Sequence, residues 1–215
     1  MTEIKGISVD DWKKKICEEA ERLRPQLIQL SHSIHDEPEI GFQEFKSSAK
    51  ICDFLEKQGF EVTYLDVDEW GSIRLDVLEK AIRKDTILIS VMYANNEVGT
   101  IQKIAQIGKN AEKNDILFHT DAVQACGNIP INVQKMQIDM LSLSGHKLYA
   151  PKGTGALYVK NGIEFEKFID GGHQEKNKRA GTENVSGIVG LGKACELANI
   201  NLEEHQKYLT KLRDY

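Results

Sequence analysis

The sequence predicts an α/β protein in which a mainly parallel sheet is covered by helices and is preceded by an α-helical amino-terminal segment. From about residue 59 onward, short apolar runs alternate with stretches of helical spacing, a pattern typical of parallel sheets with helical connections. Upstream of that point only helical spacing is found. The chain has 215 residues, 40% of them hydrophobic, enough for one large domain or two small ones. We therefore expect a helical part at 1–58 and an α/β part at 59–215.

Two helices are expected in the amino-terminal part. Apolar residues follow helical spacing through residues 23–34, and Pro25 inside this stretch predicts a kink or a fresh helix start. A second helical stretch covers residues 45–55. Gly59 follows it at the position of a C-cap, where glycine tolerates a left-handed backbone.

Strands and helices are expected to alternate in the second part. The expected strands are 60–65, 86–92, 116–119, 140–144 and 156–159. The expected helices are 75–83, 101–113, 185–197 and a last one from 202 to the end of the sequence. The last two strands are close enough in sequence to pair antiparallel across the turn that contains Gly153 and Gly155.

Charge and cysteine content exclude several classes of function. A net charge of -5 argues against a general nucleic-acid or acidic-membrane surface. The four cysteines show no close metal-type or redox-type spacing, which suits a reducing compartment. No apolar run approaches the ~18 residues of a membrane span, and no secretory signal pattern opens the sequence. We expect a cytoplasmic protein without membrane or nucleic-acid partners.

Two polar runs at the ends of expected strands carry the side chains that a pyridoxal phosphate site needs. This cofactor requires a lysine for a Schiff base, a carboxylate at its ring nitrogen and small donors at its phosphate. Lys147 is the candidate amine and Asp121 the candidate carboxylate, and both follow apolar runs where ligands bind in α/β sheets. The alternative for Lys147 is a surface lysine. The alternative for Asp121 is a helix N-cap, a role that can coexist with the contact to the cofactor.

The α/β part resembles the central region of a cysteine desulfurase of the class V aminotransferase family, over about residues 59–213. The stretches that carry this resemblance are 94–100, 120–124, 142–147, 149–159 and 179–182. The resemblance implies a partial large domain of pyridoxal-phosphate fold type I. It also implies conversion of L-cysteine to L-alanine, with the sulfur passed to an acceptor cysteine and onward to an acceptor protein in iron-sulfur cluster assembly.

The resemblance also implies roles for individual residues. Lys147 would hold the cofactor and carry the proton at the substrate Cα, while Asp121 would stabilise the protonated ring. Gln124 and Asn96 would lie at the phenolic oxygen and the substrate face. Asn96 could equally serve turn geometry, because asparagine tolerates a left-handed backbone.

The phosphate contacts implied by the resemblance are Ser144 and His146, which flank the lysine. The alternative for His146 is a buried histidine whose hydrogen bonds are satisfied within the protein. Thr182 would reach the phosphate of a neighbouring subunit's cofactor, which implies a symmetric homodimer with shared sites.

Several residues expected of a complete cysteine desulfurase are not found in this sequence. The sequence has other residues in place of the upstream phosphate loop, which is rich in glycine, serine and threonine, and in place of the ring-stacking histidine. The arginine that binds the substrate carboxylate and the cysteine that accepts sulfur are not found downstream either. Cys126 does not occupy the position of the sulfur-accepting nucleophile in the family's motifs, and it is interpreted as a small buried residue. A second hypothesis is therefore a non-catalytic truncated or fusion protein that keeps part of a cofactor domain.

The amino-terminal part has its own resemblance. Residues 30–45 and 55–62 are similar to the start of a zinc-dependent amidohydrolase of the aminoacylase type, which makes a remnant of such an enzyme a third hypothesis. The His-x-Asp segment that would supply zinc ligands does not follow, and a junction of the two families is expected near 52–65. The nearby cluster His32, His35, Asp36, Glu37 and Glu39 is interpreted as a solvated helix end, and no metal site is expected.

Overall fold

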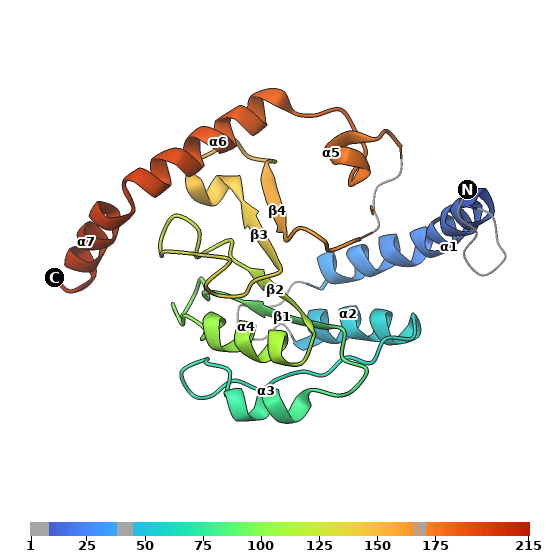
Figure 1. The fold of residues 1–215 in the computed structure, drawn as a ribbon, viewed down its shortest axis with the longest axis horizontal. Coiled ribbons are helices and arrows are strands. Elements are labelled where there is room, and N and C mark those ends of the chain that lie inside the picture. The colour runs from blue at the N-terminus through green and yellow to red at the C-terminus, as the bar shows by residue number, and fades with distance from the viewer. Residues whose placement is uncertain (1–8, 38–44, 166, 168–170) are drawn as a thin grey trace. The chain divides into compact units, whose positions relative to one another are not determined.

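The structure is a computed structural model that describes residues 9–37, 45–165, 167 and 171–215 (Figure 1). The chain divides into two compact units, Met1–Tyr64 and Leu65–Tyr215. Across the described ranges, no helix combines the length and the apolar character needed to cross a membrane.

The first unit contains the helices α1, Val9–His35, and α2, Phe45–Lys57. Helix α1 continues through Pro25, so the fresh helix start that this proline predicted does not occur. The two helices are joined by a bond from the Lys50 ammonium of α2, which donates to the Ser33 carbonyl oxygen of α1 at 2.5 Å.

The end of α2 confirms one prediction and the segment after it contradicts another. Gly59 adopts a left-handed backbone with φ of 88°, and the Phe60 N–H donates to the Leu55 carbonyl at 3.1 Å, as expected for a glycine C-cap. The strand predicted at 60–65 is wrong, because these residues pair with no strand. A strand needs a hydrogen-bonded neighbour, and in the described part of the chain the sheet begins only at residue 88.

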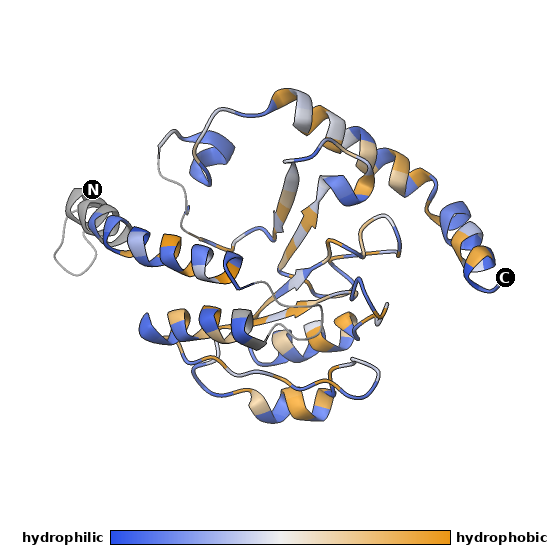
Figure 2. Ribbon diagram, turned by 180° about the vertical axis from the view of Figure 1, so that it is seen from behind, coloured by the Kyte–Doolittle hydropathy of each residue, from blue (hydrophilic) through white to orange (hydrophobic). Residues whose placement is uncertain are grey.

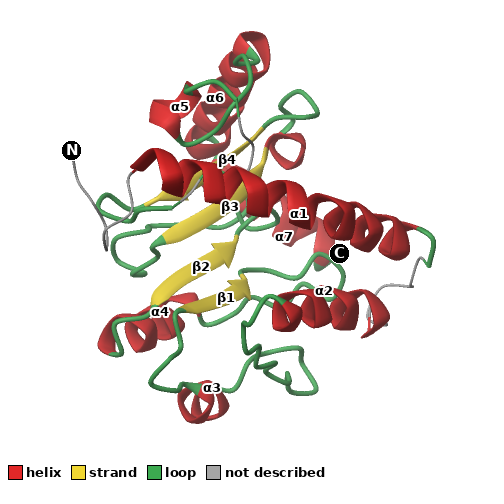
Figure 3. Ribbon diagram, turned by 90° about the vertical axis from the view of Figure 1, so that its right-hand side faces the viewer, coloured by secondary structure: helices red, strands yellow, loops and turns green. Residues whose placement is uncertain are grey.

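The second unit is built on a sheet of four strands in the order β1-β2-β3-β4 (Figure 3). The strands are β1, Leu88–Met92; β2, Leu117–Asp121; β3, Met140–Ser144; and β4, Gly155–Val159. The first three are parallel to one another, and β4 pairs antiparallel with β3. The predicted mainly parallel sheet and the antiparallel last pair are confirmed.

Helices connect and follow these strands. They are α3, Leu75–Ala81; α4, Ile104–Lys113; α5, Gln174–Asn177; α6, Val185–Ile200; and α7, Leu202–Arg213, with a 3-10 turn η1, Gly145–Leu148, after β3. In Figure 2 hydrophobic and hydrophilic residues share the ribbon of α4, which buries one face that includes Ile104 and Ile107, whereas the short α5 is hydrophilic throughout.

The core lies on one face of the sheet. Phe118 and Thr120 of β2 are fully buried, and Phe118 belongs to one apolar cluster with Ile104 and Ile107 of α4. The other face is more open, because its leucines are 46%, 39% and 51% exposed at positions 88, 117 and 157. Side chains along a strand alternate between these two faces, so the polar residues His119 and Asp121 share the open face.

One carboxylate ties together the edge of the sheet where β2 and β3 begin. Asp139, directly before β3, accepts the Phe118 N–H on Oδ2 and the Lys160 ammonium on Oδ1, both at 3.0 Å. Lys160 directly follows β4, so this single residue links the starts of β2 and β3 to the end of β4. The hydrogen bonds of Asp139 therefore hold these strands together at the edge of the sheet opposite the candidate site.

Candidate functional site

The parallel strands bring the candidate residues to one edge of the sheet. Because β1, β2 and β3 run in the same direction, their carboxyl ends lie together, with Met92 opposite Asp121 and Asp121 opposite Ser142. Asp121 ends β2 and Ser144 ends β3, while Asn96 follows β1 in the next turn. This is the edge at which α/β sheets bind ligands.

Asp121 uses only part of its hydrogen-bonding capacity within the protein. Its Oδ1 accepts the Val123 N–H at 2.9 Å, and its backbone carbonyl accepts the Tyr93 N–H at 2.8 Å. The chain after it forms successive turns without an α-helix, so the alternative of a helix N-cap is wrong and the carboxylate makes an Asx turn instead. Oδ2 accepts no hydrogen bond from any residue that the structure describes, and it remains available to a ligand.

Gln124 lies in the turns that follow Asp121 and is half-buried. Its backbone carbonyl accepts a hydrogen bond from the Asn128 side chain at 2.9 Å. The side-chain amide of Gln124 makes no bond with another described residue, so it keeps both its donors and its acceptor.

The turn η1 presents Ser144, His146 and Lys147 at the end of β3. A hydrogen bond of 2.7 Å joins Ser144 Oγ to His146 Nδ1. The His146 side chain is exposed, so the alternative of a buried, satisfied histidine is wrong. Lys147 is exposed as well, and its ammonium forms no ion pair in the described part of the chain.

Gly145 explains why this motif can turn so tightly. Its N–H donates to the Thr154 carbonyl at 2.8 Å, which brings the two backbones close together. A Cβ at this position would lie 2.7 Å from Thr154 Oγ1 and 3.0 Å from the Thr154 carbonyl oxygen. Only glycine therefore fits between Ser144 and His146 without a shift of the neighbouring strand.

The turn that carries Asn96 is stabilised by its neighbour. Asn95 Oδ1 accepts the backbone N–H groups of Glu97 and Val98, each at 2.9 Å, and Gly99 supplies the left-handed backbone with φ of 77°. Asn96 has no positive φ, so the alternative that it serves as a left-handed turn residue is wrong. Its exposed side chain is not used by the turn.

Thr182 lies in the segment between α5 and α6. Two residues later, Asn184 caps α6 by accepting the Gly187 N–H at 3.1 Å. The Thr182 side chain is exposed and has no hydrogen bond to the other candidate residues within the described chain. Its predicted role at a second subunit's phosphate stays a prediction.

The histidine and acid cluster at the end of α1 is used in part by an ion pair. The Glu37 carboxylate contacts the Lys50 ammonium at 3.2 Å. His32 and His35 occupy the last turn of α1, and Glu39 lies outside the described residues. No group of three metal-ligating side chains is found among the residues that the structure describes.

Cys126 lies beneath the candidate edge in an apolar setting. It packs against the small cluster of Leu148, Ala150 and Leu191, and Cys195 packs there too. Burial raises the pKa of the Cys126 thiol to about 11, with smaller contributions from Cys195 and Asp121. Cys126 is therefore a weak nucleophile near neutral pH.

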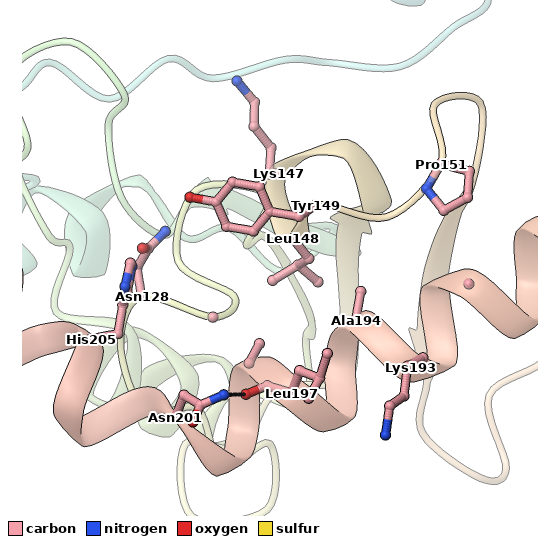
Figure 4. Close-up of a pocket in the computed structure, with 13 residues that line it drawn as sticks. Asn128, Lys147, Leu148, Tyr149, Pro151, Lys193, Ala194, Leu197, Asn201 and His205 are labelled. Carbon is pink, nitrogen blue, oxygen red and sulfur yellow. Dashed lines mark hydrogen bonds between the residues drawn. The ribbon is translucent and has the colours of Figure 1, made fainter.

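A pocket of about 470 Å³ lies on the α6 side of η1 (Figure 4). Leu148, Ala194 and Leu197 form part of its wall, and Lys147 lines it as well. Figure 4 shows the Lys147 side chain extended away from Leu197 and α6. Asp121, Ser144 and His146 do not line this pocket, so it is distinct from the polar set at the sheet edge.

One polar group of the open sheet face had no role in the sequence analysis. His119 of β2 lies between two serines, with Ser90 Oγ 2.8 Å from its Nδ1 and Ser142 Oγ 2.8 Å from its Nε2. Burial lowers the pKa of the His119 imidazole, and nearby Asp121 acts in the opposite direction. The signal available in the sequence was the two-residue spacing from Asp121, which places both side chains on one face.

The family model of class V aminotransferases matches residues 26–215. The chain belongs to the class V aminotransferase family. The match begins at residue 26, inside the amino-terminal part that was predicted to be similar to an amidohydrolase. Enzymes of this family, including cysteine desulfurases, depend on pyridoxal phosphate.

Curated relatives of this class V chain include cysteine desulfurases. It is 60% identical to the cysteine desulfurase IscS of Methanosarcina thermophila over 163 residues, which are 76% of this chain and 40% of that protein. It is 58% identical to IscS of Dictyoglomus turgidum over 164 residues, 76% of this chain and 42% of the relative. The chain thus spans about two fifths of the curated relatives that it matches.

Solved structures agree with the partial class V fold. A NifS-like protein superposes with a TM-score of 0.75 at 37% identity, over 87% of this chain and 53% of its own. A structure of SspA in complex with cysteine superposes with a TM-score of 0.67 at 50% identity, over 71% of this chain and 45% of its own. The predicted resemblance to cysteine desulfurases and the predicted partial large domain are confirmed.

Proposed function

We propose that this chain carries the cofactor-binding part of a cysteine desulfurase and binds pyridoxal phosphate through Lys147. The observation that supports this is the gathering of an amine, a carboxylate with a free oxygen and a hydroxyl-imidazole pair at the carboxyl edge of one parallel sheet. These are the groups that the cofactor's aldehyde, ring nitrogen and phosphate require. The residues present therefore fit the cofactor.

The candidate residues are proposed to have different roles in cofactor binding. Lys147 would hold the cofactor through its amine and would carry the proton at the substrate Cα. Asp121 offers Oδ2 to the ring nitrogen, since Oδ1 is held by the Val123 N–H. When bound, pyridoxal phosphate supplies an electron sink for the carbanion of the substrate.

Neutral polar side chains complete the site. Ser144 and His146 offer a hydroxyl and an imidazole to the phosphate, while Gln124 and Asn96 keep their amides free for the phenolic oxygen and the substrate. Thr182 is proposed to act at the phosphate of a second copy, so that two copies share their sites.

L-cysteine is the proposed substrate, and an acceptor protein for its sulfur is the proposed partner. The substrate is supported by the similarity to cysteine desulfurases and by the related structure described as a complex with cysteine. We expect turnover by these 215 residues alone to be near background, because the ring-stacking histidine and the acceptor cysteine have no counterparts in this sequence.

The test is cofactor binding followed by spectroscopy. Purified protein is titrated with pyridoxal phosphate, and a visible absorbance band that borohydride abolishes is expected for a lysine-bound cofactor. Lys147→Ala should lose the band and the attached cofactor mass. Lys152→Ala, an exposed lysine five residues away, should keep both.

Two results would contradict the proposal. One is a wild-type protein without a borohydride-sensitive band, and the other is a Lys147→Ala protein that keeps it. Production of alanine and sulfide from L-cysteine, measured on the same sample, separates cofactor binding from turnover.

A further inference from the structure

The His119 side chain of β2 forms hydrogen bonds to both neighbouring strands on the open face of the sheet. Ser90 on β1 lies opposite His119 on β2 in the strand register, and their side chains are 2.8 Å apart. On the other side of the ring, His119 Nε2 is 2.8 Å from Ser142 Oγ on β3. The imidazole therefore links β1, β2 and β3, which are neighbouring strands in Figure 3, through side-chain hydrogen bonds.

This polar row directly precedes the row of candidate site residues. His119 and Asp121 are two residues apart on β2, and Ser142 and Ser144 are two residues apart on β3, so each pair projects from one face. A change in the hydrogen bonds of His119 would therefore affect Asp121 and Ser144, which lie only two residues further along β2 and β3.

The charge of the imidazole matters because Asp121 is its neighbour. An imidazolium there would compete with the cofactor's ring nitrogen for the Asp121 carboxylate. A neutral imidazole still satisfies both serines, since one nitrogen donates and the other accepts while each hydroxyl can do either. Burial favours this neutral form, because it lowers the pKa of the His119 imidazole.

We propose that His119 is a positioning residue of the cofactor site, a neutral bridge that aligns β1, β2 and β3 and leaves the charge of Asp121 for the cofactor's ring nitrogen. This inference rests on the proposed function and extends it to a residue that does not touch the reacting atoms. It has two measurable parts, the state of the imidazole and the effect of that state on the bound cofactor.

The first test needs no cofactor. Nitrogen NMR of histidine-labelled protein, with the His119 signals assigned from their loss in His119→Gln, should show a neutral ring in one tautomer at neutral pH. Ser90→Ala should shift mainly the Nδ1 signal, and Ser142→Ala mainly the Nε2 signal. A protonated ring, or nitrogen signals that neither serine variant moves, would overturn the bridge.

The second test compares two replacements of similar length, one neutral and one cationic. His119→Gln keeps a neutral donor and acceptor, and it should retain the position of the visible band of bound pyridoxal phosphate with a loss of affinity of about fivefold. His119→Lys places a cation beside Asp121, and it should shift the band and weaken binding about tenfold further. His32→Lys, which changes an exposed histidine of α1 in the same way, is the control and should leave the band in place.

The outcomes separate this inference from the proposed function. If the wild-type protein binds no cofactor, the proposed function fails and with it the link to Asp121, while the NMR result still decides the bridge. If the wild-type protein binds the cofactor but His119→Gln and His119→Lys give the same band and affinity, the positioning role is refuted and the proposed function stands.

Discussion

Asp121 divides its two carboxylate oxygens between structure and ligand. Oδ1 holds the turn after β2 by accepting the Val123 N–H, while Oδ2 faces no donor among the described residues. A turn and a charged ligand contact are usually supplied by different residues. Here one side chain provides both, so a well-chosen substitution can separate them.

Asp121→Asn is expected to separate these two functions. The asparagine Oδ1 still accepts the Val123 N–H, so we expect the free energy of unfolding to change by less than about 0.5 kcal/mol. The charge is lost, so pyridoxal phosphate should bind at least about tenfold more weakly, or ~1.4 kcal/mol. Urea unfolding and cofactor titration measure the two effects.

The control for this prediction is Asp121→Ala, which removes the turn bond as well and should cost about 1 kcal/mol of folding free energy. Equal cofactor affinity in Asp121→Asn and wild type would show that the carboxylate charge is not used.

Cys126 predicts an alkaline loss of stability. The pKa of its thiol is raised in the folded protein from 9.0 to about 11, so the unfolded chain gives up this proton at lower pH than the folded one. Its contribution to stability is therefore complete below pH 9.0 and is lost as the pH rises toward about 11. Urea unfolding across this range should show a decline that is reduced in Cys126→Ala. The same decline in both proteins would count against a buried thiol.

Residue types that follow from local chemistry were predictable, and those that depend on contacts were not. Asp121, Ser144 and Lys147 were predicted at or just after strand ends, because an apolar run followed by polar residues is typical of a strand end. Turn geometry was an alternative for Asn96, whereas the side chain that stabilises the turn is that of Asn95, a difference that only hydrogen bonds to specific backbone groups reveal.

At the scale of elements, β3 was predicted with its observed bounds, 140–144, whereas 60–65 was predicted as a strand and forms none. Both stretches have strand-like composition. The difference is that β3 has neighbours on both sides, and pairing is a property of the sheet that composition does not contain. The helix predicted from 101 begins at 104. Gln102 lies before this helix, and its side-chain amide accepts the Ile73 N–H and donates to the Gly71 carbonyl oxygen.

The packing of α4 against the chain before β3 predicts opposite effects for two helical glycines. A Cβ on Gly108 of α4 would overlap the Met136 carbonyl oxygen and lie 3.1 Å from that of Gln137, whereas nothing lies within 4 Å of one on Gly192 of α6. Gly108→Ala should therefore destabilise the protein by about 1–3 kcal/mol. Gly192→Ala should stabilise it by about 0.5–1 kcal/mol, because alanine favours the helix.

Thermal or urea unfolding of the two variants decides this prediction. A stable Gly108→Ala protein would mean that α4 does not pack closely on the segment that precedes β3.

At the scale of the whole molecule, the sheet has a buried face and an open one. Leucines 88, 117 and 157 bring apolar surface to the open face from three different strands. Exposed apolar surface on a sheet favours association between copies. The chain spans about two fifths of its curated relatives, so this face belongs to a fold that is larger in those proteins.

Leu88→Lys is expected to weaken self-association of the isolated chain about tenfold, or ~1.4 kcal/mol, with little effect on folding because the side chain is exposed. Light scattering over a concentration series measures the change. Leu212→Lys, which alters an exposed leucine of α7 in the same way, is the control. An equal effect of the two substitutions would show that net charge, and not the sheet face, governs association.

Asp139 has a consequence for how this protein could be altered. It binds the starts of β2 and β3 to the end of β4, at the edge of the sheet that holds none of the proposed cofactor ligands. These two hydrogen bonds of Asp139 do not involve the loops at 93–103, 122–128 and 145–150. Apart from positions such as Gly145, where only glycine fits, those loops can exchange residues, and the chemistry that they carry can diverge, while Asp139 continues to hold the opposite ends of the strands together.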